Sequence, residues 1–73
     1  MSQQIVWNKL VNFMGPSRAQ ELMNETLEQL GLNELRNAND RLRFATLLIQ
    51  RGGAPGLIGK TIALQARLHG AQG

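Results

Sequence analysis

Glycine and proline divide this chain into four segments, and each segment has the pattern of a helix. The breaks fall at Gly15-Pro16, Gly31, Gly52-Gly53 and Gly70. Glycine is common just past the C-terminus of a helix and proline cannot continue one, so these positions predict helix ends. We therefore predict an all-α fold, a compact bundle of about four short helices, in which residues 1–73 form a single helical domain.

The second segment carries the clearest helical signal, because its apolar and small residues recur at intervals of three and four. The residues of this face are Ala19, Leu22, Met23, Thr26, Leu27 and Leu30. Ser17 and Gln20 have the spacing of a capping box, which predicts a helix over residues 17–30. Gly31 is expected to adopt the left-handed conformation of a Schellman motif, with Leu32 folded back over the last turn.

The remaining segments predict three further helices, at about residues 3–14, 40–51 and 55–69. Pro55 suits the first turn of the last helix, because a proline there lacks an N–H that would otherwise need an acceptor. The stretch L-L-I in the third segment is also compatible with a buried strand. The helix is preferred because no other segment offers a partner strand.

The last helix is predicted to have two faces that can pack. Its larger residues share one face, which we assign to the core of the chain: they are Leu57, Ile58, Thr61, Ile62, Leu64 and Leu68. The small residues share a nearly opposite face: they are Gly59, Ala63, Ala66 and Gly70. Glycine inside a helix costs about 1 kcal/mol relative to alanine, so close packing against a second chain is the expected reason for this face.

The small size of the chain favours self-association. A protein of 73 residues buries only about 60% of its unfolded surface, so a single core gives marginal stability. The chain has no cysteine and one histidine, His69, which excludes disulfides and gives no basis for a zinc site within one chain. We expect no metal and no cofactor. An oligomer is the remaining way to stabilise so small a scaffold.

Charge is distributed unevenly along the sequence. Residues 1–35 carry four glutamates against Lys9 and Arg18, whereas residues 36–73 carry six basic residues against Asp40. The whole chain has a net charge of +3. This asymmetry predicts either a basic surface for an acidic partner or complementary poles for self-pairing.

Two sets of candidate site residues follow from these patterns. For a homo-oligomer or a protein partner, the interface is expected to combine the small face of the last helix with an acidic stripe: Gly59, Lys60, Ala63, Ala66, Arg67, Glu21, Glu25 and Glu28. For a nucleic acid, the candidate phosphate contacts are Arg36, Arg41, Arg43, Arg51 and Lys60. In that second set, Arg36 and Arg43 share one helical face if the third helix extends far enough.

The octapeptide A-P-G-L-I-G-K-T at residues 54–61 fits a loose phosphate-loop pattern, with Ala54 where the strict pattern has glycine. Nucleotide hydrolysis also needs a parallel sheet beneath that loop and an acidic metal ligand. An all-α chain cannot supply the sheet, and no arrangement of nucleophile, base and orienting group is evident. We therefore expect no enzymatic activity, and no hydrolysis that depends on Lys60.

These observations favour a small, non-catalytic, helical protein–protein interaction module that acts by self-association or by docking a partner. The alternative is a basic nucleic-acid-binding or regulatory protein that uses the arginine- and lysine-rich C-terminal half. A third hypothesis is a nucleotide or anion binder that uses residues 54–61 without hydrolysis. The N-terminus has no basic leader followed by an apolar run, and no apolar run reaches transmembrane length. We expect a cytoplasmic location and no membrane partner.

Overall fold

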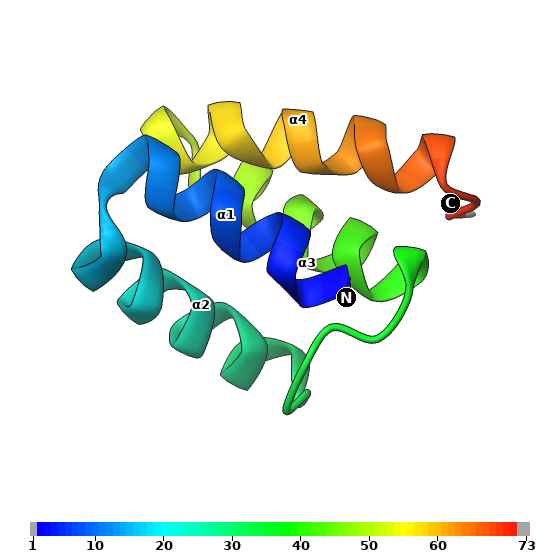
Figure 1. Ribbon diagram of the computed structural model, residues 1–73, viewed down its shortest axis with the longest axis horizontal. Coiled ribbons are helices and arrows are strands. Elements are labelled where there is room, and N and C mark those ends of the chain that lie inside the picture. The colour runs from blue at the N-terminus through cyan, green and yellow to red at the C-terminus, as the bar shows by residue number, and fades with distance from the viewer. Residues whose placement is uncertain (1, 72–73) are drawn as a thin grey trace.

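Each of the four segments forms one helix. The computed structural model describes residues 2–71 and places α1 at Ser2–Met14, α2 at Pro16–Leu30, α3 at Ala38–Arg51 and α4 at Gly53–Leu68 (Figure 1). No strand occurs within those residues. The all-α prediction is therefore confirmed, and every predicted helix end lies within two residues of the observed one. The oligomer remains a prediction.

A single residue, Gly15, connects α1 to α2. Its φ of 84° and ψ of 162° lie in a region that is open almost only to glycine. Pro16 then begins α2, where its fixed φ suits the first turn. The predicted capping box is therefore wrong: Ser17 lies inside the helix and makes no capping bond, and Gln20 instead donates its side-chain amide to Asn24 Oδ1 at 2.9 Å.

The C-terminus of α2 forms the predicted Schellman motif. Gly31 has a φ of 70°, and its N–H donates to the Glu28 carbonyl at 3.0 Å. The N–H of Leu32 donates to the Leu27 carbonyl at the same distance. These two bonds satisfy carbonyls that a helix end otherwise leaves unpaired, and they turn the chain toward α3.

The segment between α2 and α3 is held at both of its ends. Asn37 caps α3 by accepting the Asp40 N–H at 2.9 Å, while the Asp40 carboxylate accepts the Arg36 N–H at 3.0 Å. This reciprocal pair begins α3 two residues before the predicted start. The Leu35 N–H donates to Gln3 Oε1 at 2.8 Å, which ties the segment to the first turn of α1.

α3 and α4 form the most closely packed pair of helices. A Cβ atom added at Gly59 would lie 2.8 Å from Leu48 Cβ and 2.9 Å from the Ala45 carbonyl oxygen. No real Cβ atom tolerates such distances, so glycine is required where the two helices meet. Further along α4, Ala63 and Ala66 are 4% and 0% exposed and continue the contact.

The predicted roles of the two faces of α4 are therefore reversed. The face of small residues, which we expected to meet a second chain, packs inside the same chain. Of the large residues assigned to the core, Ile62 is buried and Ile58 is half-buried, whereas Leu57, Leu64 and Leu68 are exposed. The physical reason is that Leu48 and the backbone of α3 occupy the space beside Gly59, so α4 can approach α3 this closely only with its small face.

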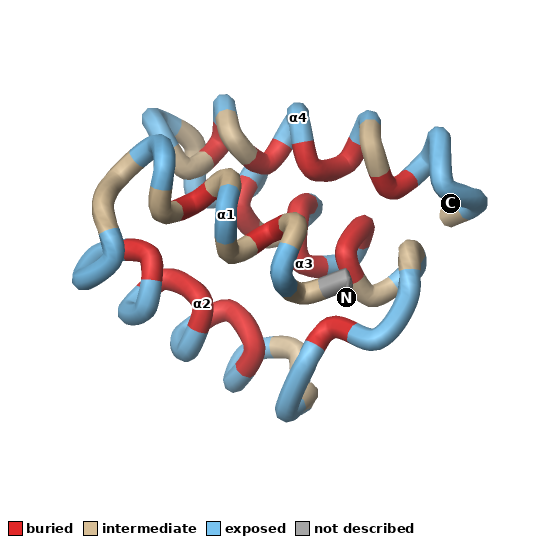
Figure 2. The backbone as a smooth tube through the Cα atoms, viewed as in Figure 1, coloured by how far each residue is buried: buried red, intermediate tan, exposed pale blue. Residues whose placement is uncertain are grey.

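The centre of the molecule is filled by side chains from all four helices. The largest fully buried ones are Phe44, Leu10, Leu48, Val6 and Thr26, from α3, α1 and α2. Figure 2 shows the buried stretches of all four helices turned toward the space that they share. α4 and α2 lie on opposite sides of the molecule, with α1 and α3 between them (Figure 1).

The Gly15 turn generates a prediction about stability. Gly15→Ala should lower the free energy of unfolding by about 1–3 kcal/mol, because the backbone conformation excludes a Cβ. No atom lies within 4 Å of the added Cβ, so a clash would not contribute. Ser17→Ala, two residues away, should change stability by less than about 0.5 kcal/mol. Urea denaturation followed by circular dichroism measures both, and equal losses would contradict the observed start of α2.

The contact at Gly59 generates a second prediction. Helix propensity alone predicts that Gly59→Ala stabilises α4 by about 1 kcal/mol. We expect a net loss of about 1–3 kcal/mol instead, because the added Cβ overpacks the contact with Leu48 and Ala45. Lys60→Ala is the control and should change stability by less than about 0.5 kcal/mol. A more stable Gly59→Ala variant in urea denaturation would rule out the close approach.

Candidate interaction surface on helix α4

An apolar stripe runs along the solvent face of α4, made of Leu57, Leu64 and Leu68 with Thr61 between them. These positions are spaced by four, three and four residues, the spacing of the contact seam between paired helices. The three leucines are 62%, 59% and 74% exposed. The Thr61 hydroxyl donates to the Leu57 carbonyl at 3.3 Å, so its polar group is bonded within the helix.

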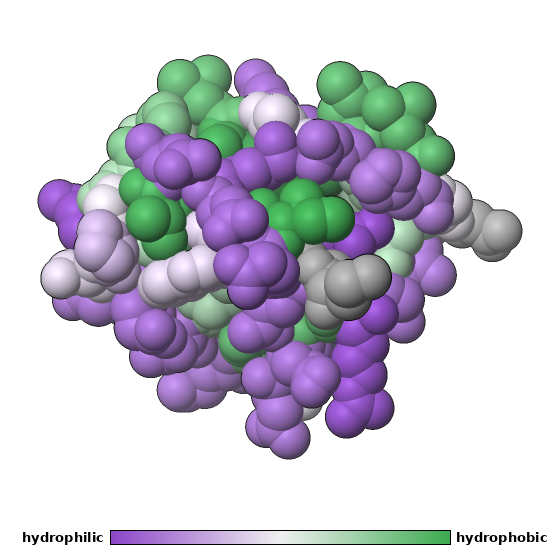
Figure 3. Space-filling view, viewed as in Figure 1, coloured by the Kyte–Doolittle hydropathy of each residue, from purple (hydrophilic) through white to green (hydrophobic). Residues whose placement is uncertain are grey.

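The stripe is more than scattered surface hydrophobicity. A single exposed leucine is ordinary, but full burial of a leucine side chain contributes about 1.5–3 kcal/mol, and each of these three leaves more than half of that unused. Figure 3 shows hydrophobic surface above both ends of α4. An exposed apolar surface that follows one helix face is typical of a site where another protein docks.

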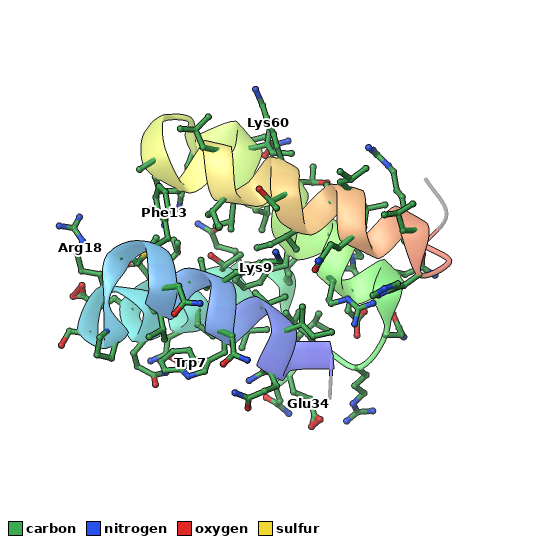
Figure 4. The ribbon with its side chains drawn as sticks, turned by 45° about the horizontal axis from the view of Figure 1, so that its top comes forward. Trp7, Lys9, Phe13, Arg18, Glu34 and Lys60 are labelled. Carbon is green, nitrogen blue, oxygen red and sulfur yellow. The ribbon has the colours of Figure 1, made fainter. Side chains whose placement is uncertain are left out.

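One flank of the stripe is positively charged. Lys60 and Arg67 are seven residues apart, share one side of α4 and are exposed. Lys60 projects away from the body of the molecule (Figure 4). The other flank carries Ile58 and Gln65, which are neutral and half-buried. α4 contains no acidic residue, so the charge beside the stripe is not balanced within the helix.

The structure separates the residues predicted for a protein interface into different places. Gly59, Ala63 and Ala66 are buried against α3, so the prediction that they form a free contact surface is wrong. Lys60 and Arg67 remain on the surface beside the apolar stripe. The three leucines were predicted to lie in the core because they are large and apolar, and the structure exposes them instead.

The acidic stripe lies on the exposed side of α2, on a different helix from Lys60 and Arg67. Glu21, Glu25 and Glu28 are all exposed. Within residues 2–71, no Cα atom of α2 comes within 8 Å of one in α4. Glu25 is also engaged inside the chain, because Arg51 Nη2 donates to its carboxylate at 2.6 Å. The acidic and basic parts of the predicted interface therefore do not form one surface on a single chain.

The predicted phosphate contacts do not form one exposed surface either. Arg41 is only 7% exposed, so the structure does not present it on the surface where a phosphate contact was predicted. Its burial could have been predicted, since it lies four and seven residues before the core residues Ala45 and Leu48. Arg51 is paired with Glu25. Arg36 precedes the cap of α3, so the helix does not extend far enough for Arg36 and Arg43 to share one helical face.

Arg43 and Lys60 are the remaining members of the phosphate set with exposed side chains that make no ion pair within residues 2–71. Residues 54–61, which fit the phosphate-loop pattern, lie inside α4 instead of in a loop before a helix. The amide of Gly56, for example, donates to the Gly52 carbonyl at 3.1 Å and is not available to a phosphate. This geometry differs from a phosphate loop.

A hollow lies between the start of α2 and the α3–α4 corner. Phe13, Leu22 and Pro55 line it, together with the paired Glu25 and Arg51. Its charged lining residues are Arg18, Glu21, Glu25 and Arg51, of which Arg51 and Glu25 pair with each other. Within residues 2–71, no three histidine, aspartate or glutamate side chains gather in a way that could hold a metal ion. The apolar stripe of α4 is accordingly the best-defined candidate site.

Comparisons with known protein families, with curated proteins and with solved structures found no match. The proposal of a function therefore depends on the surface of the chain itself. In the described part of the chain, none of the helices combines the length and the apolar character needed to cross a membrane.

A matched pair of substitutions tests which face of α4 supports the fold. Ile62→Ala should lower the free energy of unfolding by about 2–5 kcal/mol, because Ile62 is buried. Leu64→Ala, on the same helix, should change it by less than about 0.5 kcal/mol. Both are measured by urea denaturation at low and high protein concentration, so that any association is seen separately. Similar large losses for the two variants would restore the face assignment made from the sequence, which placed both residues in the core.

Proposed function

We propose that this protein is a non-catalytic interaction module that binds another protein, or a second copy of itself, through the outer face of α4. The observation that carries the proposal is the stripe of Leu57, Leu64 and Leu68, which are more than half exposed. The stripe spans about 16 Å along the helix, from the rise of about 1.5 Å per residue. A partner that covered it would bury apolar surface that the isolated chain exposes to water.

Nucleic-acid binding receives less support from the surface. Phosphate binding draws on a shared face of basic side chains, and two of the five candidates are buried or paired: Arg41 and Arg51. The exposed Lys60 and Arg67 also lie beside the leucines of α4. A phosphate backbone bound to these two residues would offer the leucines no apolar surface to pack against. A protein surface matches both the apolar stripe and its charged flank.

Site-specific photo-crosslinking tests the proposed function. A benzophenone amino acid replaces Leu64 in one variant and Gln50, an exposed residue of α3, in the control. Both proteins are produced in cells of the source organism and irradiated, and the products are analysed by mass spectrometry. We expect position 64 to give a discrete cross-link to a protein, either another protein or a second copy of this chain, and position 50 to give none.

Other cross-linking results would contradict the proposal. Absence of a protein product from position 64, or the same products from both positions, would show that the outer face of α4 is not a specific docking surface. A cross-link from position 64 to nucleic acid would support the alternative function. Such binding would also weaken by orders of magnitude between low and moderate salt, because it depends on phosphate contacts.

A further inference from the structure

We propose that the partner of α4 is an amphipathic helix whose apolar seam is flanked by acidic residues, and not a second copy of this chain. The inference rests on the proposed function and specifies the kind of partner. It is carried by two observations: the helical spacing of the apolar stripe, and the unbalanced positive charge of Lys60 and Arg67 beside it.

The spacing of the stripe indicates a helical partner. Leu57, Thr61, Leu64 and Leu68 follow intervals of four, three and four, so they present side chains at the positions through which two helices interlock. A second helix laid along α4 would place its own apolar residues between these side chains. An extended segment would need free backbone groups to pair with, and α4 uses its backbone groups within the helix.

The charge of the flank indicates acidic residues on that partner. In paired helices, the residues beside the apolar seam face each other and select the partner by their charge. Lys60 and Arg67 occupy such positions on one side of the stripe, and no acidic residue of α4 neutralises them. Glutamates or aspartates on the facing helix would supply the opposite charge, and basic residues there would repel.

Pairing of α4 with its own copy is disfavoured by the same charges. In an antiparallel pair the basic flanks of the two copies would face each other, so Lys60 and Arg67 would meet the same residues of the second chain. In a parallel pair they would face the flank of Ile58 and Gln65, which offers no negative charge. Neither arrangement uses the positive flank.

The acidic helix of a second copy is also a poor match. α2 exposes Glu21, Glu25 and Glu28, but its apolar residues are buried in its own core: Ala19, Leu22, Met23 and Leu27. The leucines of α4 would then lie against carboxylates. Contacts between α4 of one copy and α2 of the next would also join different surfaces, which gives open chains unless the rotation closes a ring.

A pair of designed peptides tests the charge preference. Each peptide has three heptads with leucine at both seam positions; one carries glutamate at the flanking positions and the other carries lysine. The like charges within each peptide oppose its self-association. Binding to the full protein is measured by fluorescence anisotropy at low and moderate salt. We expect the glutamate peptide to bind roughly tenfold more tightly than the lysine peptide at low salt, with a smaller difference at moderate salt.

Substitutions then separate the local effect from net charge. Leu64→Asp should weaken binding of the glutamate peptide by roughly tenfold or more. Circular dichroism checks that this variant keeps its helical content. If the helical content is lost, Leu68→Asp is used in place of Leu64→Asp. Lys60→Glu combined with Arg67→Glu should invert the preference toward the lysine peptide. Lys60→Glu alone should weaken binding of the glutamate peptide more than Arg18→Glu, which makes the same change in charge at an exposed site on α2 (Figure 4).

Three results would overturn the inference. The first is equal binding of the two peptides, or no binding of the glutamate peptide. The second is an equal effect of Lys60→Glu and Arg18→Glu. The third is a parent protein that light scattering shows to be a dimer and that Leu64→Asp dissociates, since the occupant would then be a second copy. Each of these leaves the proposed function standing if position 64 still cross-links to a protein, so the two failures are distinguishable.

Discussion

The close approach of α4 to α3 at Gly59 determines most of this structure. A side chain at that position would collide with Leu48 and with the Ala45 carbonyl, so the two helices can meet only through a glycine. Once they meet there, Ala63 and Ala66 must also face α3, because they follow Gly59 on the same side of the helix. The larger residues on the opposite side are then turned to solvent. The exposed stripe on α4 is thus a direct result of how the core is packed.

Local interactions set the rest of the arrangement. The Gly15 turn reverses the chain between α1 and α2 within one residue, and the Schellman motif at Gly31 ends α2. The Asn37 cap starts α3, and the bond from Leu35 to Gln3 fixes the preceding segment against α1. These bonds hold α1 and α2 against the side of α3 that α4 does not cover. As a result, α2 and α4 lie on opposite sides of the molecule (Figure 1).

The sequence predicted the fold class and the helix ends well, because glycine and proline act locally on the backbone. It predicted the orientation of α4 wrongly. Periodicity shows which residues share a face but not which face meets the neighbouring helix, and that choice depends on the space that Leu48 and the Ala45 carbonyl of α3 occupy beside Gly59. The capping box at Ser17 was wrong because Pro16 begins the helix one residue earlier. Arg41 was expected at the surface because it is charged, although its register with Ala45 and Leu48 places it inside.

Different residues of α4 support the fold and form the exposed stripe, and this separation affects how the protein can change over evolutionary time. The residues that hold α4 in place are Gly59, Ile62, Ala63 and Ala66, whereas Leu57, Leu64 and Leu68 take little part in the core. Mutations of the first group would be removed by selection for a folded chain, whatever the partner. The second group is free to drift or adapt without loss of the scaffold. Related chains could therefore keep the same four helices while they diverge in what they recognise.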